Sequence, residues 1–463
     1  MGKAKIFYFS LRNQQNKTQK INWLSTTTFD KIAFDHVQPD AKANWINLTN
    51  NDFDDFLPLI DKEVKAGKSE SGKAIFQIFS RGFETGRDEW IYDFNDANLK
   101  SKSIFFINKY NQSINIGFMD QSIKWNSSLK SSFVKKMMVK YSKDLIKSSA
   151  WRPFTKKRIY TEPVFIHRLT NAHTQIYGQN LFASEKSPVI CCTDQGTQSP
   201  FMITATKYIP DLHLVGTAAQ CLPFYRYDKE GNRLENITDW GLTQFQTHYT
   251  DQTITKENLF HYVYAVLHNP AYRQKYEQNL KRDFPRIPFY DDFFQWVKWG
   301  QKLMDLHLNY ETIEPYPIKR IDIPTDIKTP KPKLKADKSA NKIILDDVTT
   351  LENIPQIVWE YKLGNRSALE WILDQYKEKK PKDPTISEKF NTYKFADYKE
   401  QVIDLLTRVC TVSVKTMQII QLMDKREQQR QELLKNVAQA EKEYNQGNFR
   451  RGSVDDLMAE LEE

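Results

Sequence analysis

The chain has 463 residues, of which 40% are hydrophobic and 13% aromatic, so we expect a mostly globular protein with more than one core. The net charge of +9 suits a polyanionic ligand without identifying one, and the 15 glycines are too few for a protein built on glycine-rich phosphate loops. No apolar run reaches the roughly 18 residues of a membrane span, and the N-terminus lacks the apolar core of a secretory signal.

The N-terminal 320 residues contain apolar runs typical of strands and apolar runs typical of helices. Residues 1–45 predict a strand at Lys5–Leu11, a polar turn at Asn13–Lys20, and then a further strand or helix. Over residues 46–320, short β-rich runs alternate with longer runs of helical spacing. This mixture indicates an α+β (mixed α/β) fold. The strand-like runs are Ser103–Ile107, Ile159–Phe165, Val189–Cys192 and Phe201–Thr204, and the helical runs are Asn51–Ala66 and Leu129–Lys147.

A packed group of helices is predicted over residues 254–310. Apolar residues recur at helical spacing from Leu259 to Val266 and form one face of a helix. Asn269 is a good N-cap, and Pro270 follows at the first helical position, where proline is tolerated. The run Asn269–Tyr272 imitates the Asn-Pro-Pro-Tyr loop of adenine methyltransferases, but that loop follows a strand. We therefore interpret these four residues as a helix cap.

The C-terminal third divides into three predicted parts. Residues 321–345 are rich in proline, lysine and aspartate and predict an extended linker. Residues 346–424 are mainly helical, and a long charged helix is predicted over about Lys399–Tyr444. Residues 425–463 form a charged helical tail, in which Gly447 is expected to end the helix. An exposed charged tail is the favoured interpretation, and if the tail binds a ligand, the acids at its end favour a protein partner over DNA.

Positive charge is concentrated between Lys124 and Arg158. This span contains eleven lysines and arginines, and Asp144 is its only acid. Such a one-signed surface favours phosphate binding, because each neutralised phosphate releases counterions. A solvated lysine-rich helix face is the alternative interpretation.

Two further patterns bear on catalysis. Asp347, Glu360 and Lys362 imitate the two acids and the lysine that hold magnesium in many restriction nucleases, a spacing that also arises by chance. The four cysteines lack a paired metal-ligand spacing, so we predict neutral thiols of an intracellular protein and no metal site.

Several segments taken together resemble the C-terminal target-recognition (specificity) region of Type ISP restriction–modification enzymes. These are single-chain bacterial proteins that join nuclease, helicase, adenine-methyltransferase and DNA-recognition parts. The resemblance runs in order over about residues 1–420. It is carried by AKIFYFSLRN, NWINLTNNDFDDFLPL, IFQIFSRGFETGRDEWIYDF, WRPFTKKRIY, IPDLH, NITDW, residues 254–310, GNRSALEWILDQY and FADYKEQVIDLLTRVCTVSVKTMQII.

The resemblance implies a sequence-specific DNA-recognition module that is not catalytic alone. Residues 1–45 would be a remnant of the methyltransferase edge, residues 46–320 the target-recognition domain, and residues 346–424 the helical end of the specificity region. The implied partners are double-stranded DNA and a methyltransferase and helicase–nuclease polypeptide, in the bacterial cytoplasm. S-adenosylmethionine, ATP and magnesium are implied for the full enzymes, and no cofactor is expected in this chain. The alternative is a magnesium-dependent nuclease that uses Asp347, Glu360 and Lys362.

Candidate DNA-contacting residues are arginines, lysines and amides in loops of the matched segments. Arginine can pair with guanine, and asparagine or glutamine with adenine, through two hydrogen bonds. Arg152, which precedes a proline, is expected to be structural, whereas Lys156, Lys157 and Arg158 are expected at phosphates. Base readout is expected from Arg87, Gln195 or Gln198. The full candidate set is Arg81, Arg87, Asp88, Arg152, Lys156, Lys157, Arg158, Arg168, Asn171, Gln195 and Gln198.

Overall fold

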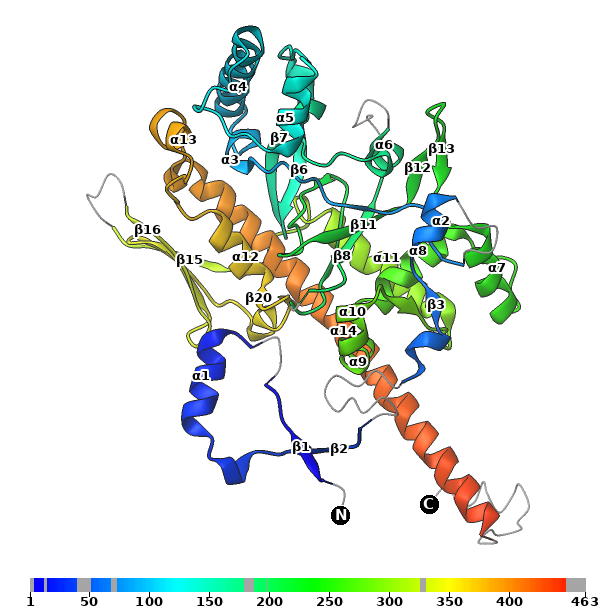
Figure 1. Ribbon diagram of the computed structural model, residues 1–463. Helices are drawn as coiled ribbons and strands as arrows, with labels where there is room; N and C mark the ends of the chain where they lie inside the picture. Colours follow the sequence, from blue (N-terminus) through cyan, green and yellow to red (C-terminus); the bar gives the residue numbers. More distant parts are fainter. Residues whose placement is uncertain are drawn as a thin grey trace.

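The computed structural model describes residues 4–11, 15–39, 51–67, 73–178, 187–197, 199–324 and 330–446. Helices and short strands alternate through most of this chain (Figure 1), which confirms the predicted α+β fold. None of the helices in the described part has the length and apolar composition needed to cross a membrane.

The first described segment lies apart from the cores. Strands β1 (Ile6–Tyr8) and β2 (Asp35–Val37) pair antiparallel, and helix α1 (Lys17–Thr26) and the 3-10 turn η1 (Phe29–Lys31) lie between them. Asn16 caps α1, so the polar residues that we predicted as a turn begin a helix instead. None of the described residues between 4 and 39 is buried.

A central antiparallel sheet carries a hydrophobic core on each face. Its strand order is β4 (Ser80–Arg81), β11 (Ala219–Pro223), β8 (Val189–Thr193) and β9 (Ile203–Thr206). Side chains alternate across β8: Ile190 and Cys192 join one core, whereas Val189 and Cys191 join the other. Burial on both faces explains why the strand reads as a continuous apolar run.

One face of the central sheet is covered by helices from the predicted helical group. These are α7 (Asp239–His248), α8 (Lys256–Val266), α9 (Pro270–Lys275), α10 (Glu277–Arg282) and α11 (Phe293–Leu308). Asn269 accepts a hydrogen bond from the Ala271 N–H at 3.0 Å, which confirms the predicted cap with Pro270 at the first position. Helices α8 and α11 approach closely at Gly300, where no side chain intervenes.

A separate lobe has the third hydrophobic core and is built on a second sheet. The strand order of this sheet is β10 (Ile209–Pro210), β6 (Ile146–Arg152), β7 (Thr155–Tyr160) and β5 (Tyr92–Asp93). Helices α3 (Asp88–Ile91), α4 (Asp96–Ile116) and α5 (Ser127–Val134) belong to this lobe.

Two predictions for the secondary structure of this lobe are wrong. The expected strand 103–107 lies inside α4, whose buried residues recur at helical spacing. The expected helix 129–147 ends at Val134, and β6 begins at Ile146.

The region predicted as an extended linker contributes to a third sheet. Strands β15 (Lys319–Asp322), β18 (Thr349–Glu352), β17 (Lys342–Asp346) and β16 (Pro332–Asp337) pair in that order. The linker prediction for residues 321–345 is therefore wrong for the described residues. Leu334, Ile343 and Leu345 are buried in the second core, and this burial offsets the polar composition of the segment.

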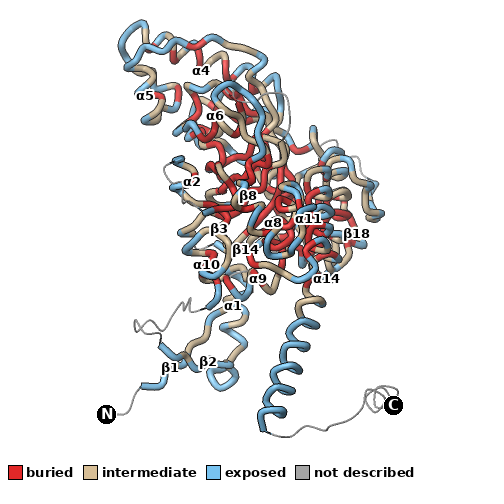
Figure 2. The backbone as a smooth tube through the Cα atoms, turned by 90° about the vertical axis from the view of Figure 1, so that its right-hand side faces the viewer, coloured by how far each residue is buried: buried red, intermediate tan, exposed pale blue. Residues whose placement is uncertain are grey.

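The chain ends in two short helices, α12 (Ala368–Gln375) and α13 (Pro384–Lys389), and the long helix α14 (Lys399–Asn445). Helix α14 contributes to two hydrophobic cores, because Leu406 joins the second core and Met423 the first. Its last turns project into solvent (Figure 2). The long charged helix is thus confirmed, whereas the prediction for Gly447 lies outside the described residues, and the partner of the tail stays a prediction.

Other short elements connect these parts. They are η2 (Asp52–Asp55), β3 (Leu57–Pro58), α2 (Lys62–Ala66), η3 (Lys143–Leu145), η4 (Pro163–Phe165), α6 (Asn171–Tyr177), β12 (Tyr225–Tyr227), β13 (Arg233–Glu235), β14 (Arg286–Ile287), η5 (Gln356–Trp359), β19 (Lys362–Leu363), β20 (Arg366–Ser367) and η6 (Phe395–Tyr398). The predicted helix 51–66 is thus interrupted by β3, and only its last part is helical.

Candidate nucleic-acid interface

The short helix α6 presents polar side chains on its outer face. Ala172, His173 and Ile176 point into the protein, whereas Asn171 is exposed. The His173 ring is held by the Arg81 carbonyl, 3.0 Å from Nε2, and by the Thr170 hydroxyl, 2.8 Å from Nδ1. Burial lowers the pKa of His173 to about 4, so the ring is neutral at pH 7. Helix α6 is therefore anchored through its inner face.

The loop before α6 joins it to α5. The hydroxyl of Ser128, in the first turn of α5, lies 2.7 Å from Nδ1 of His167. The next residue, Arg168, has a left-handed backbone with φ of 51° and a side chain that is 68% exposed. Its guanidinium lies 3.8 Å from the Glu84 carboxylate, so it is only loosely held.

A hollow lies between α6 and the hairpin formed by β12 and β13, which Figure 1 shows side by side. Arg226 is half-buried there, and its Nε is shielded from solvent with no acceptor among the described residues. An unpaired buried donor is costly, so an acceptor supplied by a ligand would be favoured. The hollow is lined by Asn171, Thr174, Gln175, Arg226, Tyr227, Asp228, Lys229 and Glu230.

Near α6, the turn that follows β8 carries Asp194 and Gln195 beside Arg81 of the edge strand β4. Arg81 on β4 lies 3.5 Å from the Asp194 carboxylate, and Asp194 also accepts hydrogen bonds from the Gln220 side chain and the Gln195 backbone, both at 2.9 Å. Gln195 is half-buried in this turn, and Gln198 lies outside the described residues. We call the outer residues of this region the recognition surface: Arg81, Arg168, Asn171, Thr174, Gln175, Gln195 and Arg226.

Arg87, by contrast, lies inside the lobe, and the neighbouring Asp88 is half-buried. Arg87 is 1% exposed and donates hydrogen bonds to the carbonyls of Phe165, at 2.7 Å, and Lys124, at 3.3 Å. Burial lowers the pKa of Arg87 to about 10. Asp88 accepts a hydrogen bond from the Thr85 hydroxyl. The expectation that Arg87 reads bases is therefore corrected, because its guanidinium already connects segments of the lobe.

The four basic residues of the β6–β7 hairpin face the rest of the protein. Arg152 pairs with the buried Asp211 at 2.5 Å, which agrees with its predicted structural role. Lys156 pairs with Glu311 at 2.6 Å, and Arg158 pairs with Asp96 at 2.7 Å.

Lys157 of the same hairpin lies over two aromatic rings. Its ammonium is 4.2 Å from the Trp151 ring centroid and 4.9 Å from that of Phe94. Burial, reinforced by the nearby positive charges of Lys102 and Arg152, lowers the pKa of Lys157 to about 7. The expectation of an open phosphate contact is thus corrected for Lys157, whereas Lys156 and Arg158, whose side chains are 34% and 31% exposed in surface ion pairs, stay candidates.

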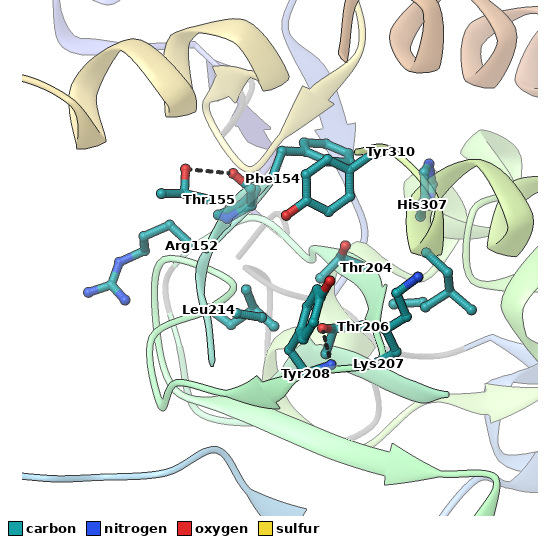
Figure 3. Close-up of a pocket in the computed structure, with 14 residues that line it drawn as sticks. Arg152, Phe154, Thr155, Thr204, Thr206, Lys207, Tyr208, Leu214, His307 and Tyr310 are labelled. Atoms are coloured by element: carbon teal, nitrogen blue, oxygen red, sulfur yellow. Dashed lines mark hydrogen bonds between the residues drawn. The ribbon is translucent and has the colours of Figure 1, made fainter. Parts of the chain in front are cut away.

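Beneath the turn of this hairpin is a small cavity (Figure 3). Its lining includes Phe154, Thr204, Tyr208 and Tyr310, and Arg152 points away from it. Its volume of about 20 Å³ matches roughly one water molecule and excludes a nucleotide base. The cavity is therefore a packing defect between the hairpin and α11.

Comparison with known protein families identifies the family of this chain. A family model described as the Type ISP C-terminal specificity domain matches residues 74–405. The chain belongs to this family. The resemblance drawn from the sequence motifs is thereby confirmed. No curated protein matches the chain.

Three solved structures similar to this Type ISP specificity domain were determined with DNA or a DNA mimic. A DrdV–DNA complex determined by cryo-electron microscopy is 42% identical, with a TM-score of 0.76, and the match covers 90% of this chain and 43% of that one. A nuclease-deletion mutant of the Type ISP restriction–modification enzyme LlaGI, with a DNA substrate mimic, is 28% identical, with a TM-score of 0.68 and coverages of 90% and 39%. LlaBIII, an ATP-dependent Type ISP restriction–modification enzyme bound to DNA, is 26% identical, with a TM-score of 0.70 and coverages of 84% and 25%. This chain spans less than half the length of each.

The residues of the alternative nuclease hypothesis lie on separate elements of this Type ISP specificity domain. Asp347 follows β17 and pairs with Lys333 at 2.8 Å, whereas Glu360 is exposed after η5 and Lys362 lies on β19. Over the described ranges, no group of three or more histidine, cysteine or acidic side chains is placed to hold a metal ion. These positions give the nuclease alternative no support, and we do not propose it.

The hairpin residues of the recognition surface were missed by sequence reasoning. Arg226 lies in Tyr225–Tyr227, a short β-rich run followed by the polar turn DKEGN. That pattern is a hairpin signal and could have been recognised. The position of this hairpin beside α6 could not have been recognised, because that position depends on contacts between segments about 50 residues apart.

Proposed function

We propose that this chain recognises a specific sequence in double-stranded DNA and positions an N6-adenine methyltransferase and a helicase–nuclease supplied by further polypeptide. The observation that carries the proposal is the 42% identity, over 90% of this chain, to DrdV, which was solved with DNA. LlaGI and LlaBIII, also solved with DNA or a DNA mimic, add support at lower identity. Because its ligand would be genomic or phage DNA, we place the chain in the bacterial cytoplasm.

The recognition surface is suited in its chemistry to base edges in the major groove. Arg81, Arg168 and Arg226 can each donate two hydrogen bonds to guanine O6 and N7. Asn171 and Gln175, four residues apart on α6, can pair with adenine N6 and N7. We propose no cofactor for this chain. S-adenosylmethionine, ATP and magnesium would be bound by other parts of the full enzymes.

The proposal is tested by selecting DNA from a randomised duplex library with the purified chain. We expect one enriched motif, and we expect Arg226→Ala or Gln175→Ala to relax one position of it at a cost of about 1–3 kcal/mol for each lost pair. Gln301→Ala, at an exposed position of α11, is the matched control and should leave the motif unchanged. A wild-type chain that enriches no motif would refute the proposed function.

A further inference from the structure

A second basic surface lies beside the recognition surface and is not explained by base readout. It consists of six exposed lysines on and around α5, which we call the lysine strip: Lys124, Lys130, Lys135, Lys136, Lys140 and Lys143. No acidic residue occurs between Lys124 and Lys143. The ion pairs of this lobe use other lysines, such as Lys102 with Asp93 and Lys109 with Asp120, and none joins the strip to an acid within the described residues.

The backbone at the tip of the strip holds a lysine where glycine would fit better. Helix α5 ends with hydrogen bonds from the Lys136 N–H to the Phe133 carbonyl, at 2.9 Å, and from the Met137 N–H to the Ser132 carbonyl, at 3.1 Å. This pattern places Lys136 in the left-handed conformation, with φ of 53°, at the position that glycine usually takes. A lysine there is strained, and its exposed side chain gains no packing in return.

Apolar side chains are exposed among these lysines. Val134 is 77% exposed, Met138 55% and Met137 45%. Apolar and positive groups side by side suit the sugar–phosphate backbone, which offers apolar sugar faces between its charges. Asp144, which follows Lys143, is the only acid between Lys124 and Arg158, so the strip keeps a large net positive charge that favours a polyphosphate over a protein surface.

The strip begins at the recognition surface and extends away from it. The hydroxyl of Ser128, 2.7 Å from the His167 ring, joins the first turn of α5 to the loop that carries Arg168. The eight residues of α5 span about 12 Å, which corresponds to about three to four base pairs of duplex. Figure 1 shows α5 on the same end of the molecule as α6 and the β12–β13 hairpin.

We propose that the lysine strip is a second, sequence-independent DNA contact, which binds phosphates outside the recognised bases and extends the footprint by several base pairs. This inference rests on the proposed function. Phosphate contacts would fix the register of the duplex, while the recognition surface reads its sequence.

The main test measures affinity against salt between about 50 and 200 mM for the full chain, with a duplex carrying the selected motif and with a scrambled one. For Lys135→Ala/Lys136→Ala/Lys140→Ala, we expect the slope of log K against log salt to fall by about two to three on both duplexes. The ratio of the two affinities should be retained. The control Lys425→Ala/Lys435→Ala/Lys442→Ala removes as much charge from the exposed part of α14, at the opposite end of the molecule, and should leave the slope unchanged.

A second variant separates binding from folding. Lys136→Gly removes one charge and relieves the strained backbone, so we expect a higher thermal midpoint together with a slope lower by about one. An unchanged slope in the triple variant, with wild-type protein that binds DNA, would overturn the inference while leaving the proposed function intact. Loss of affinity for the motif duplex alone would also overturn it, because the strip would then read sequence. A wild-type chain that binds neither duplex would instead refute the proposed function.

Discussion

Helices α8 and α11 approach each other closely at Gly300, and Gly300→Ala tests how tightly this helical layer is packed. A Cβ at this position would lie 1.8 Å from the His261 carbonyl oxygen and 2.6 Å from its carbonyl carbon. Cβ atoms essentially never come within 3.0 Å of other atoms. The helices must therefore separate by about 1.2 Å, the difference between this 3.0 Å limit and the 1.8 Å distance to the carbonyl oxygen. Both neighbours are backbone atoms, so no side-chain rotation can relieve the contact.

The expected loss of stability follows from three contributions. Overpacking costs about 1–3 kcal/mol, and the gap opened along the interface forfeits part of its dispersion energy. The better helix propensity of alanine returns about 1 kcal/mol. Because the clashing atoms are backbone, the overpacking cost should lie at the upper end of its range, and subtracting the propensity gain leaves an expected loss of about 2 kcal/mol in the free energy of unfolding, to which the lost dispersion adds. Urea denaturation followed by circular dichroism measures this loss, with Gln301→Ala as the exposed control in the same helix. A loss below about 1 kcal/mol would refute the close approach of the two helices.

Two further outcomes follow from buried ionisable groups. Burial lowers the pKa of His307 to about 3, below its unfolded value of 6.5, so the unfolded state binds the extra proton and stability falls as pH drops below 6.5. The loss at pH 5 should be about 2 kcal/mol, and it should shrink in His307→Gln; equal pH dependence in both proteins would contradict this. Lys157→Met should leave the salt dependence of DNA binding unchanged, because the ammonium lies against Trp151 and Phe94. A lower slope in that titration would show that Lys157 contacts DNA.

Local patterns predicted elements well where one pattern determined the structure. The apolar spacing from Leu259 to Val266, together with the cap at Asn269, predicted α8 and the start of α9 correctly. The linker prediction was wrong because proline and lysine dominate residues 321–345, while the few apolar residues, such as Leu334 and Ile343, are those that become buried. Composition averages over a segment, whereas a sheet needs only one apolar face.

The candidate site was predictable only in part, because sequence does not show which charges are enclosed. Arg81, Arg168 and Asn171 are exposed, so they stay candidates for DNA contact. Arg87 occurs in the same kind of motif, yet it is 1% exposed and bonded to two backbone carbonyls. These contacts join Arg87 to Phe165, 78 residues away, and no local pattern predicts such a pair.

The alternation of side chains along β8 has a consequence for how this protein can be divided. Because Ile190 belongs to one core and Val189 to the other, a single strand is shared by both cores, and α14 joins them again through Leu406 and Met423. A chain cut between residues 320 and 346 would leave each product with one face of that strand or helix open to water. Neither half is then an autonomous folding unit, and exchange of target specificity between homologues would have to transplant the surface loops while keeping this shared framework intact.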